Sequence, residues 1–231
     1  MRKLIIICLF VPFFLDAQSG FNRTYSLDSL KVAFSGVVAS DDSLVVYGSI
    51  YNNTDSKWEL VVLKMDTLGD EGNRLIKKNA GIGGFNTLET KMIKTSDGGV
   101  LISGNVGYST ESFTLKLNPN LGEEFYIQSI DSINRVVFHR EAIEVSDGYI
   151  IGGDVQKQDY SDQLWASKLD YEGNVLWYRE YGAPTDTLEW AFDMAVTPEG
   201  NAMIAGIQLT PISGGNGYQY DGWPLLLTID Q

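Results

Sequence analysis

Short apolar runs alternate with turn residues along most of the chain, and this alternation predicts β-strands joined by tight turns. Over residues 171–207, the run VLWYREYG follows the turn EGN, and the run NAMIAGI follows the turn PEG. The runs are rich in Val, Ile, Trp and Tyr, and Gly, Asp and Asn stand between them, which is typical of strands and hairpins. No segment shows a helical period of useful length. The sequence therefore predicts an all-β fold.

One arrangement of turn pair, apolar run and glycine occurs four times. Its copies are SDDSLVVYGSI at 40–50, TSDGGVLISGN at 95–105, VSDGYIIGGD at 145–154 and TPEGNAMIAGI at 197–207. A second block recurs at the same intervals, and three of its four copies carry a lysine two residues before the closing Asp or Asn: Lys64, Lys116 and Lys168. Two independent markers with a common period of about 50 residues indicate tandem units. Four short strands in each unit predict a β-propeller of four-stranded antiparallel blades, with about four repeats.

The glycines of the third copy have a structural explanation. Asp147-Gly148 is expected to form a tight turn between the first two strands of the unit. Gly152-Gly153 is expected to end the second strand, where a side chain would crowd a neighbouring strand or the chain must turn outwards. A loop that binds phosphate would need a helix after its glycines, and none is predicted here.

The units extend approximately over residues 30–80, 81–130, 131–182 and 183–231, within one propeller domain at 19–231. The last unit lacks a fourth strand, whereas residues 21–29, FNRTYSLDS, match the predicted fourth strand FYIQSIDS of the second unit. This N-terminal strand, residues 21–27, is therefore available to close a ring of four blades, which would leave no exposed sheet edge. In the alternative, the chain is the first part of a larger ring.

The stretch 162–206, DQLWASKLDYEGNVLWYREYGAPTDTLEWAFDMAVTPEGNAMIAG, resembles the secreted bacterial β-propeller repeat often labelled SBBP. It is also similar to the propellers with DGGYIIAG, WLVKLD and GNVLW motifs in proteins that use the type IX secretion route. The resemblance is good over 85–206 and weaker over 21–84. It implies a propeller that acts as an exported binding or surface-interaction module, and it supplies no catalytic residues.

The N-terminal stretch MRKLIIICLFVPFFLDAQSG has the pattern of a signal peptide over residues 1–18. Arg2 and Lys3 precede an apolar run over 4–15, and small residues around Ala17 offer a cleavage zone. No later segment is long and apolar enough to span a membrane, so no transmembrane segment is expected in the mature chain. The formal net charge of −13 repels nucleic acid. We therefore expect a secreted or cell-surface protein without a nucleic-acid partner.

Long irregular loops are expected together at one end of the blades, and binding sites usually lie on such loops. The richest is 208–222, where Tyr218 and Tyr220, with the following Trp223, are placed to stack on a sugar or to pack on a peptide. A glycan or a protein is therefore the expected ligand, and its identity is not given by the sequence.

Two alternatives to a non-enzymatic binding module remain open. A propeller hydrolase acting on glycans would need two carboxylates that face each other, and Asp154, Asp159 and Asp221 are the loop acids for that role. A structural repeat domain of a larger cell-surface adhesin is the second alternative.

Other chemistry finds little support in the sequence. His139 is the single histidine, so it cannot build a usual zinc site, and no Ser or Cys stands in a recognisable nucleophile motif. A structural role is expected for His139. The sequence therefore predicts no enzyme activity, no cofactor and no metal site.

Five triplets read Asp, hydroxyl residue, aliphatic residue, which is similar to the O-glycosylation sequon of the same bacterial group. The residues modified would be Ser29, Ser43, Thr67, Ser132 and Thr187. Turn chemistry is the alternative explanation, because Asp favours turns and the aliphatic residue can begin the next strand.

Overall fold

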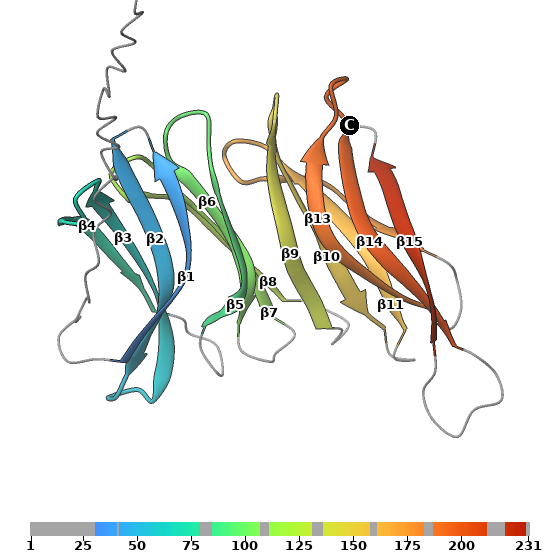
Figure 1. Cartoon of the computed structure of the whole chain (residues 1–231), viewed down its shortest axis with the longest axis horizontal. Helices are drawn as coiled ribbons and strands as arrows, with labels where there is room; N and C mark the ends of the chain where they lie inside the picture. The colour runs from blue at the N-terminus through green and yellow to red at the C-terminus, as the bar shows by residue number, and fades with distance from the viewer. Residues whose placement is uncertain are drawn as a thin grey trace, which may run out of the picture.

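The structure is a computed structural model of the chain, and it describes residues 31–40, 42–78, 85–106, 111–130, 136–157, 161–182, 187–211 and 220–229. These residues form 15 β-strands and no helix (Figure 1). The predicted all-β fold is therefore confirmed. The expected signal peptide at 1–18 and the expected closing strand at 21–27 lie outside the described residues.

The strands are arranged in groups of consecutive antiparallel neighbours. The first sheet contains β1 (Lys31–Ser40), β2 (Ser43–Asn52), β3 (Lys57–Asp66) and β4 (Glu71–Lys77). The second sheet contains β5 (Phe85–Lys94), β6 (Val100–Val106), β7 (Glu111–Leu117) and β8 (Glu123–Ile130). The third contains β9 (Val136–Val145), β10 (Gly148–Gln156), β11 (Asp162–Leu169) and β12 (Val175–Tyr181). The last group contains β13 (Leu188–Val196), β14 (Ala202–Pro211) and β15 (Tyr220–Ile229).

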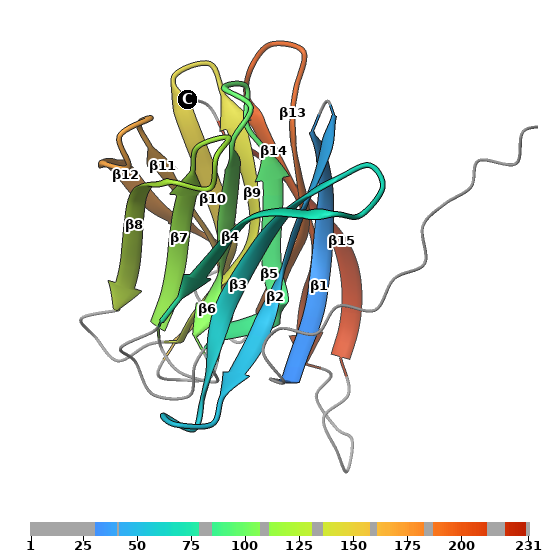
Figure 2. The ribbon, with the colours of Figure 1, turned by 90° about the vertical axis from the view of Figure 1, so that its left-hand side faces the viewer.

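The last group is connected to the third sheet by a single parallel pair, between Asp162 of β11 and Leu188 of β13. In its strand pairing it is therefore a three-stranded meander that this one pair attaches to the third sheet, and it also packs against that sheet through apolar side chains. The first strands of successive groups lie next to one another, because β1 contacts β5, β5 contacts β9 and β9 contacts β13. Figure 2 shows the second and third sheets side by side, with their fourth strands β8 and β12 on the same side.

The sheets stand in a row, and the row is open. In Figure 1 the first sheet lies at the left and β15 at the right, and no sheet in the described part of the chain closes on itself. No helix of the described residues is both long and apolar enough to cross a membrane.

Apolar side chains fill the spaces between neighbouring sheets. One buried cluster joins the first and second sheets, with members such as Leu60 and Phe113. In the third sheet, Ile150 packs towards the last group, whereas Ile151 packs towards the second sheet. Successive side chains of a strand point to opposite faces, so β10 needs a continuous apolar run to bury both of its faces. The run YIIGG of the third copy meets this need.

The glycine that recurs in each unit lies opposite a β-bulge in the first strand of that unit. In the third sheet, Gly152 pairs with Glu141 and Gly153 with His139, so Arg140 is an extra residue in β9. A Cβ atom on Gly153 would overlap the carbonyl oxygen of Phe138. The recurring glycines of the other three units also lie beside bulged first strands: Gly48, Gly104 and Gly206.

The expected crowding of a neighbouring strand at Gly152-Gly153 is therefore confirmed. The expectation that Gly152-Gly153 ends its strand is wrong, because β10 continues to Gln156. The bulge explains the difference, since glycine lets the strands approach closely at the bulge while the ladder continues beyond it.

Candidate ligand-binding site

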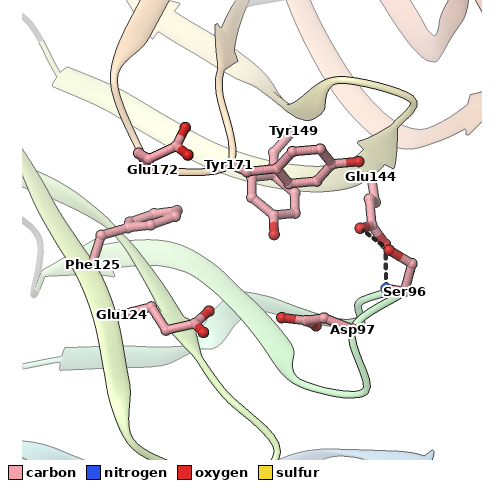
Figure 3. A pocket seen from close by; sticks show the side chains of 8 residues that line it. All are labelled: Ser96, Asp97, Glu124, Phe125, Glu144, Tyr149, Tyr171 and Glu172. Atoms are coloured by element: carbon pink, nitrogen blue, oxygen red, sulfur yellow. Dashed lines mark hydrogen bonds between the residues drawn. The ribbon is translucent and has the colours of Figure 1, made fainter.

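A pocket with a volume of about 760 Å³ opens between the second and third sheets, at the end where the short turns lie (Figure 3). This inter-sheet pocket is lined by Ser96, Asp97, Glu124, Phe125, Glu144, Tyr149, Tyr171 and Glu172. The second sheet supplies the β5–β6 turn and the start of β8. The third sheet supplies the end of β9, the start of β10 and the β11–β12 turn. Its volume is within the range of about 300–1,000 Å³ that is usual for small-ligand sites.

Lys116 lies beneath the second-sheet wall of the inter-sheet pocket. Its side chain is 1% exposed, and its Nζ donates to Asp97 Oδ2 at 2.7 Å, to Glu124 Oε2 at 2.9 Å and to the Leu117 carbonyl at 3.1 Å. An ammonium group has three donors, so all three are used. The buried lysine thereby holds two carboxylates at the edge of the pocket.

The pKa of Asp97 reflects these contacts. Burial by itself raises it, but hydrogen bonds from Lys116, Thr95 and the Gly99 backbone outweigh burial and lower the pKa of Asp97 to about 2. Asp97 is therefore ionised at neutral pH, and its charge is partly balanced by Lys116.

Two contacts fix the third-sheet wall. Glu144 accepts hydrogen bonds from the Ser96 backbone N–H at 2.6 Å and from the Ser96 hydroxyl at 2.7 Å, so it joins the two sheets. The Tyr171 hydroxyl donates to the Val145 carbonyl at 2.9 Å. These polar groups are already satisfied by protein partners.

Tyr149 has a hydroxyl group that is not satisfied in this way. The residue is 2% exposed, its ring lies 5.5 Å from the ring of Tyr171, and its hydroxyl points into the inter-sheet pocket (Figure 3). That hydroxyl has no hydrogen-bond partner among the described residues. Burial, followed by nearby carboxylates such as Glu144, raises the pKa of Tyr149, so the hydroxyl keeps its proton. The hydroxyl is thus the part of a buried residue that reaches the pocket, where a ligand atom can bond to it.

The inter-sheet pocket is strongly acidic. Four carboxylates line it, and the one buried ammonium group of Lys116 leaves three net negative charges. No group of three or more His, Cys, Asp or Glu side chains is close enough to hold a metal ion within the part of the chain that the structure describes. The negative charge is therefore spread around the pocket.

The recurring lysines have related contacts. Lys168 donates to Asp147 Oδ2 at 2.8 Å, as Lys116 does to Asp97. The lysine of the second block thus pairs with the aspartate of the turn in the second and third sheets, which links the two sequence markers. Lys64 instead donates to the Pro119 carbonyl of the second sheet at 3.0 Å.

We expect Lys116→Ala to lower the free energy of unfolding by about 3 kcal/mol, because it leaves a cavity and removes the partner of two carboxylates. Lys116→Met fills the same space, and the half-exposed carboxylates can turn to water, so its expected cost is about 1 kcal/mol. Urea unfolding of both variants measures the difference. Lys64→Ala is the control, because Lys64 occupies the equivalent position and makes no ion pair with a described residue, and it is expected to cost less than about 1 kcal/mol. Equal effects of the three substitutions would contradict this account.

The aromatic residues expected to bind a ligand lie elsewhere. Tyr220 and Trp223 are in β15, paired with Pro211 and Gln208 of β14, and Trp223 is 62% exposed. The expected loop at 208–222 is therefore wrong in its extent, since the ladder of β14 and β15 continues into it. Tyr218 lies outside the described residues. Ligand binding by these aromatic residues stays a prediction.

The two described carboxylates of the hydrolase alternative, Asp154 and Asp221, are not brought together. Asp154 is 1% exposed and accepts a hydrogen bond from Arg140 Nε at 2.9 Å. Asp221 is exposed on β15, and three strands, β11, β13 and β14, separate β15 from β10 in the sheet order. Asp159 lies outside the described residues.

His139 is enclosed between two hydroxyl groups. Its Nδ1 lies 2.9 Å from Ser103 Oγ, and its Nε2 lies 2.7 Å from Ser112 Oγ. Burial lowers the pKa of His139 to about 3, against a smaller opposing effect of a hydrogen bond with the Phe113 backbone. The imidazole is therefore neutral at ordinary pH, and its geometry fits the structural role expected for it.

The glycosylation triplets differ in accessibility. Ser43 and Thr187 are buried, whereas Thr67 is exposed in the turn after β3. Ser29 and Ser132 lie outside the described residues. Modification at any of the five positions stays a prediction, and Thr67 is the described position that is accessible in the folded chain.

The residues of the inter-sheet pocket were not recognised from the sequence as a binding site. They come from short turns and strand ends, whereas the sequence directed attention to the long loops. The recurrence of Asp97 and Lys116 with their counterparts indicates repeated structural units. It does not indicate that neighbouring units lie against each other at these turns.

Comparison of the chain with protein-family models and with curated proteins found no match.

Proposed function

We propose that this chain is an exported binding module of the β-propeller type, and that it binds its ligand in the inter-sheet pocket without catalysing a reaction. The pattern of residues 1–18 supports export. The resemblance of residues 162–206 to secreted propeller repeats supports the same location, at the cell surface or outside the cell.

Two features of the fold support the propeller. Three four-stranded meanders and one three-stranded meander follow each other along the chain. The first strands of successive groups are in contact, as expected when first strands surround a central axis. Completion of a ring requires further strands beside β15, and residues 21–27 or additional blades are the proposed sources.

One observation carries the proposed binding function. The Tyr149 side chain is almost fully buried, and its hydroxyl lacks a partner among the described residues and points into a pocket of ligand size. Apolar aromatic walls with a few convergent polar groups are typical of ligand sites.

Ligand-observed NMR tests this function with four probe sets: alkylamines, neutral oligosaccharides, acidic oligosaccharides and short peptides. We expect at least one set to bind the wild-type protein and to bind Tyr149→Phe more weakly, because this variant removes only the hydroxyl group. Thermal unfolding of the variant checks that the fold is kept. Binding by none of the sets, or equal binding to both proteins, would contradict the proposal. Cleavage products in the oligosaccharide samples would favour the hydrolase alternative.

A further inference from the structure

We infer that the inter-sheet pocket selects an alkylammonium group, either the side chain of a lysine in a peptide or a free aliphatic amine. This inference rests on the proposed binding function and names the chemistry of the ligand.

The lining offers almost no free hydrogen-bond donor. The hydroxyl and backbone N–H of Ser96 both donate to Glu144, and the Tyr171 hydroxyl donates to Val145. All three donors of Lys116 are engaged by protein oxygens. The Tyr149 hydroxyl is therefore the remaining side-chain donor among the residues of this lining. A sugar both donates and accepts through each hydroxyl group, so it would leave many of its acceptors without a partner here.

Free acceptors, in contrast, are present on both walls. Glu124 uses one carboxylate oxygen for Lys116, and no described residue donates to the other. The side chain of Glu172, which is exposed at the β11–β12 turn, accepts no hydrogen bond from a described residue. The Tyr149 oxygen is the third acceptor. A ligand that only donates fits this set, and an ammonium group donates three hydrogen bonds and accepts none.

The aromatic residues complete the site for a cation. In Figure 3 the ring of Phe125 lies between the carboxylates of Glu124 and Glu172, and Tyr149 and Tyr171 lie beside them. A cation near aromatic faces is attracted to them, most strongly where water is excluded. The aliphatic chain of the ligand would pack on the same rings. The spread of the carboxylates around the pocket also suits an extended organic cation better than a single metal ion.

The test is a calorimetric titration with matched charged and neutral probes. Cadaverine is compared with 1,5-pentanediol, and an acetylated pentapeptide with a central lysine is compared with its norleucine counterpart. We expect the charged probes to bind at least about tenfold more tightly, since charge-assisted hydrogen bonds are about twice as strong as neutral ones. If cadaverine binds as tightly as the lysine peptide, the peptide backbone adds nothing to the affinity, and a free amine is a sufficient ligand. Binding of the peptide without cadaverine assigns a protein side chain.

Two variants with the same change in net charge locate the effect. Glu172→Gln is expected to weaken binding of the charged probes about tenfold. Glu199→Gln, in the exposed β13–β14 turn, is expected to change it less than about twofold because solvent screens the lost charge. Equal effects of the two variants would overturn the inference.

The outcomes separate this inference from the proposed function. Binding of neutral oligosaccharides that Tyr149→Phe weakens, without binding of the charged probes, would overturn the ammonium site and leave the binding function intact. Absence of binding by every probe set would overturn both.

Discussion

Gly153→Ala is expected to lower the free energy of unfolding by more than about 3 kcal/mol, a large fraction of the roughly 5–15 kcal/mol that is typical of domains. The added Cβ would overlap the carbonyl oxygen of Phe138 and press on the backbone N of Arg140. These are backbone atoms of the bulge in β9, so no side-chain rotation can relieve the contact. Either the bulge shifts or β10 separates from β9.

Gly200→Ala is the matched control for this substitution. Gly200 has a φ of 92°, and nothing lies within 4 Å of an added Cβ atom. Its replacement meets only an unfavourable backbone conformation, at a cost of about 1 kcal/mol. Urea unfolding of both variants compares the two costs. A cost below about 1 kcal/mol for Gly153→Ala would show that the bulge is adaptable, contrary to the packing described.

His139 is expected to make the protein less stable as the pH falls from about 6.5 towards 3. The unfolded chain binds a proton at the ordinary histidine pKa of 6.5, whereas burial lowers the pKa of the folded His139 to about 3. Stability from the neutral imidazole is therefore complete above pH 6.5 and is lost progressively below it. The slope approaches about 1.4 kcal/mol per pH unit, and the total reaches roughly 5 kcal/mol.

The comparison with His139→Gln isolates this effect, because the chain has one histidine. The wild-type free energy of unfolding should fall more steeply than that of the variant between pH 6 and pH 4. Glu141 opposes this trend in both proteins, since burial raises its pKa. If the variant does not fold, NMR of the wild-type imidazole serves instead, and its resonances should remain unchanged down to about pH 4. Titration near pH 6.5 would contradict the burial of His139.

Much of the fold could be predicted from the sequence because it depends on local pattern. The turn pairs and the apolar runs predict strands. The recurring glycines, Gly153 and its counterparts, predict places where strands approach closely. The contact of Lys168 with Asp147 also follows the repeat, since both residues occupy fixed places in the unit.

The inter-sheet pocket could not be predicted in the same way. Glu124 and Glu172 are distant in sequence, and they line one pocket because β8 and the β11–β12 turn lie at the boundary between two sheets. That juxtaposition depends on how the sheets stack, which the strand pattern does not specify. The extent of β14 and β15 was missed for another reason. Glycines in 208–222 indicate a loop, but pairing of Pro211 with Tyr220 extends the ladder into it.

The burial of β6, β10 and β11 on both faces has a consequence for native-state hydrogen exchange. These strands are buried along almost their whole length, whereas β12 and β15 are largely exposed. Amide protons in segments with few buried contacts exchange through local opening, which requires less free energy than global unfolding. Exchange should therefore be slowest in the central strands of the second and third sheets and faster in β12 and β15, so that cooperative unfolding is centred on the two sheets that form the inter-sheet pocket.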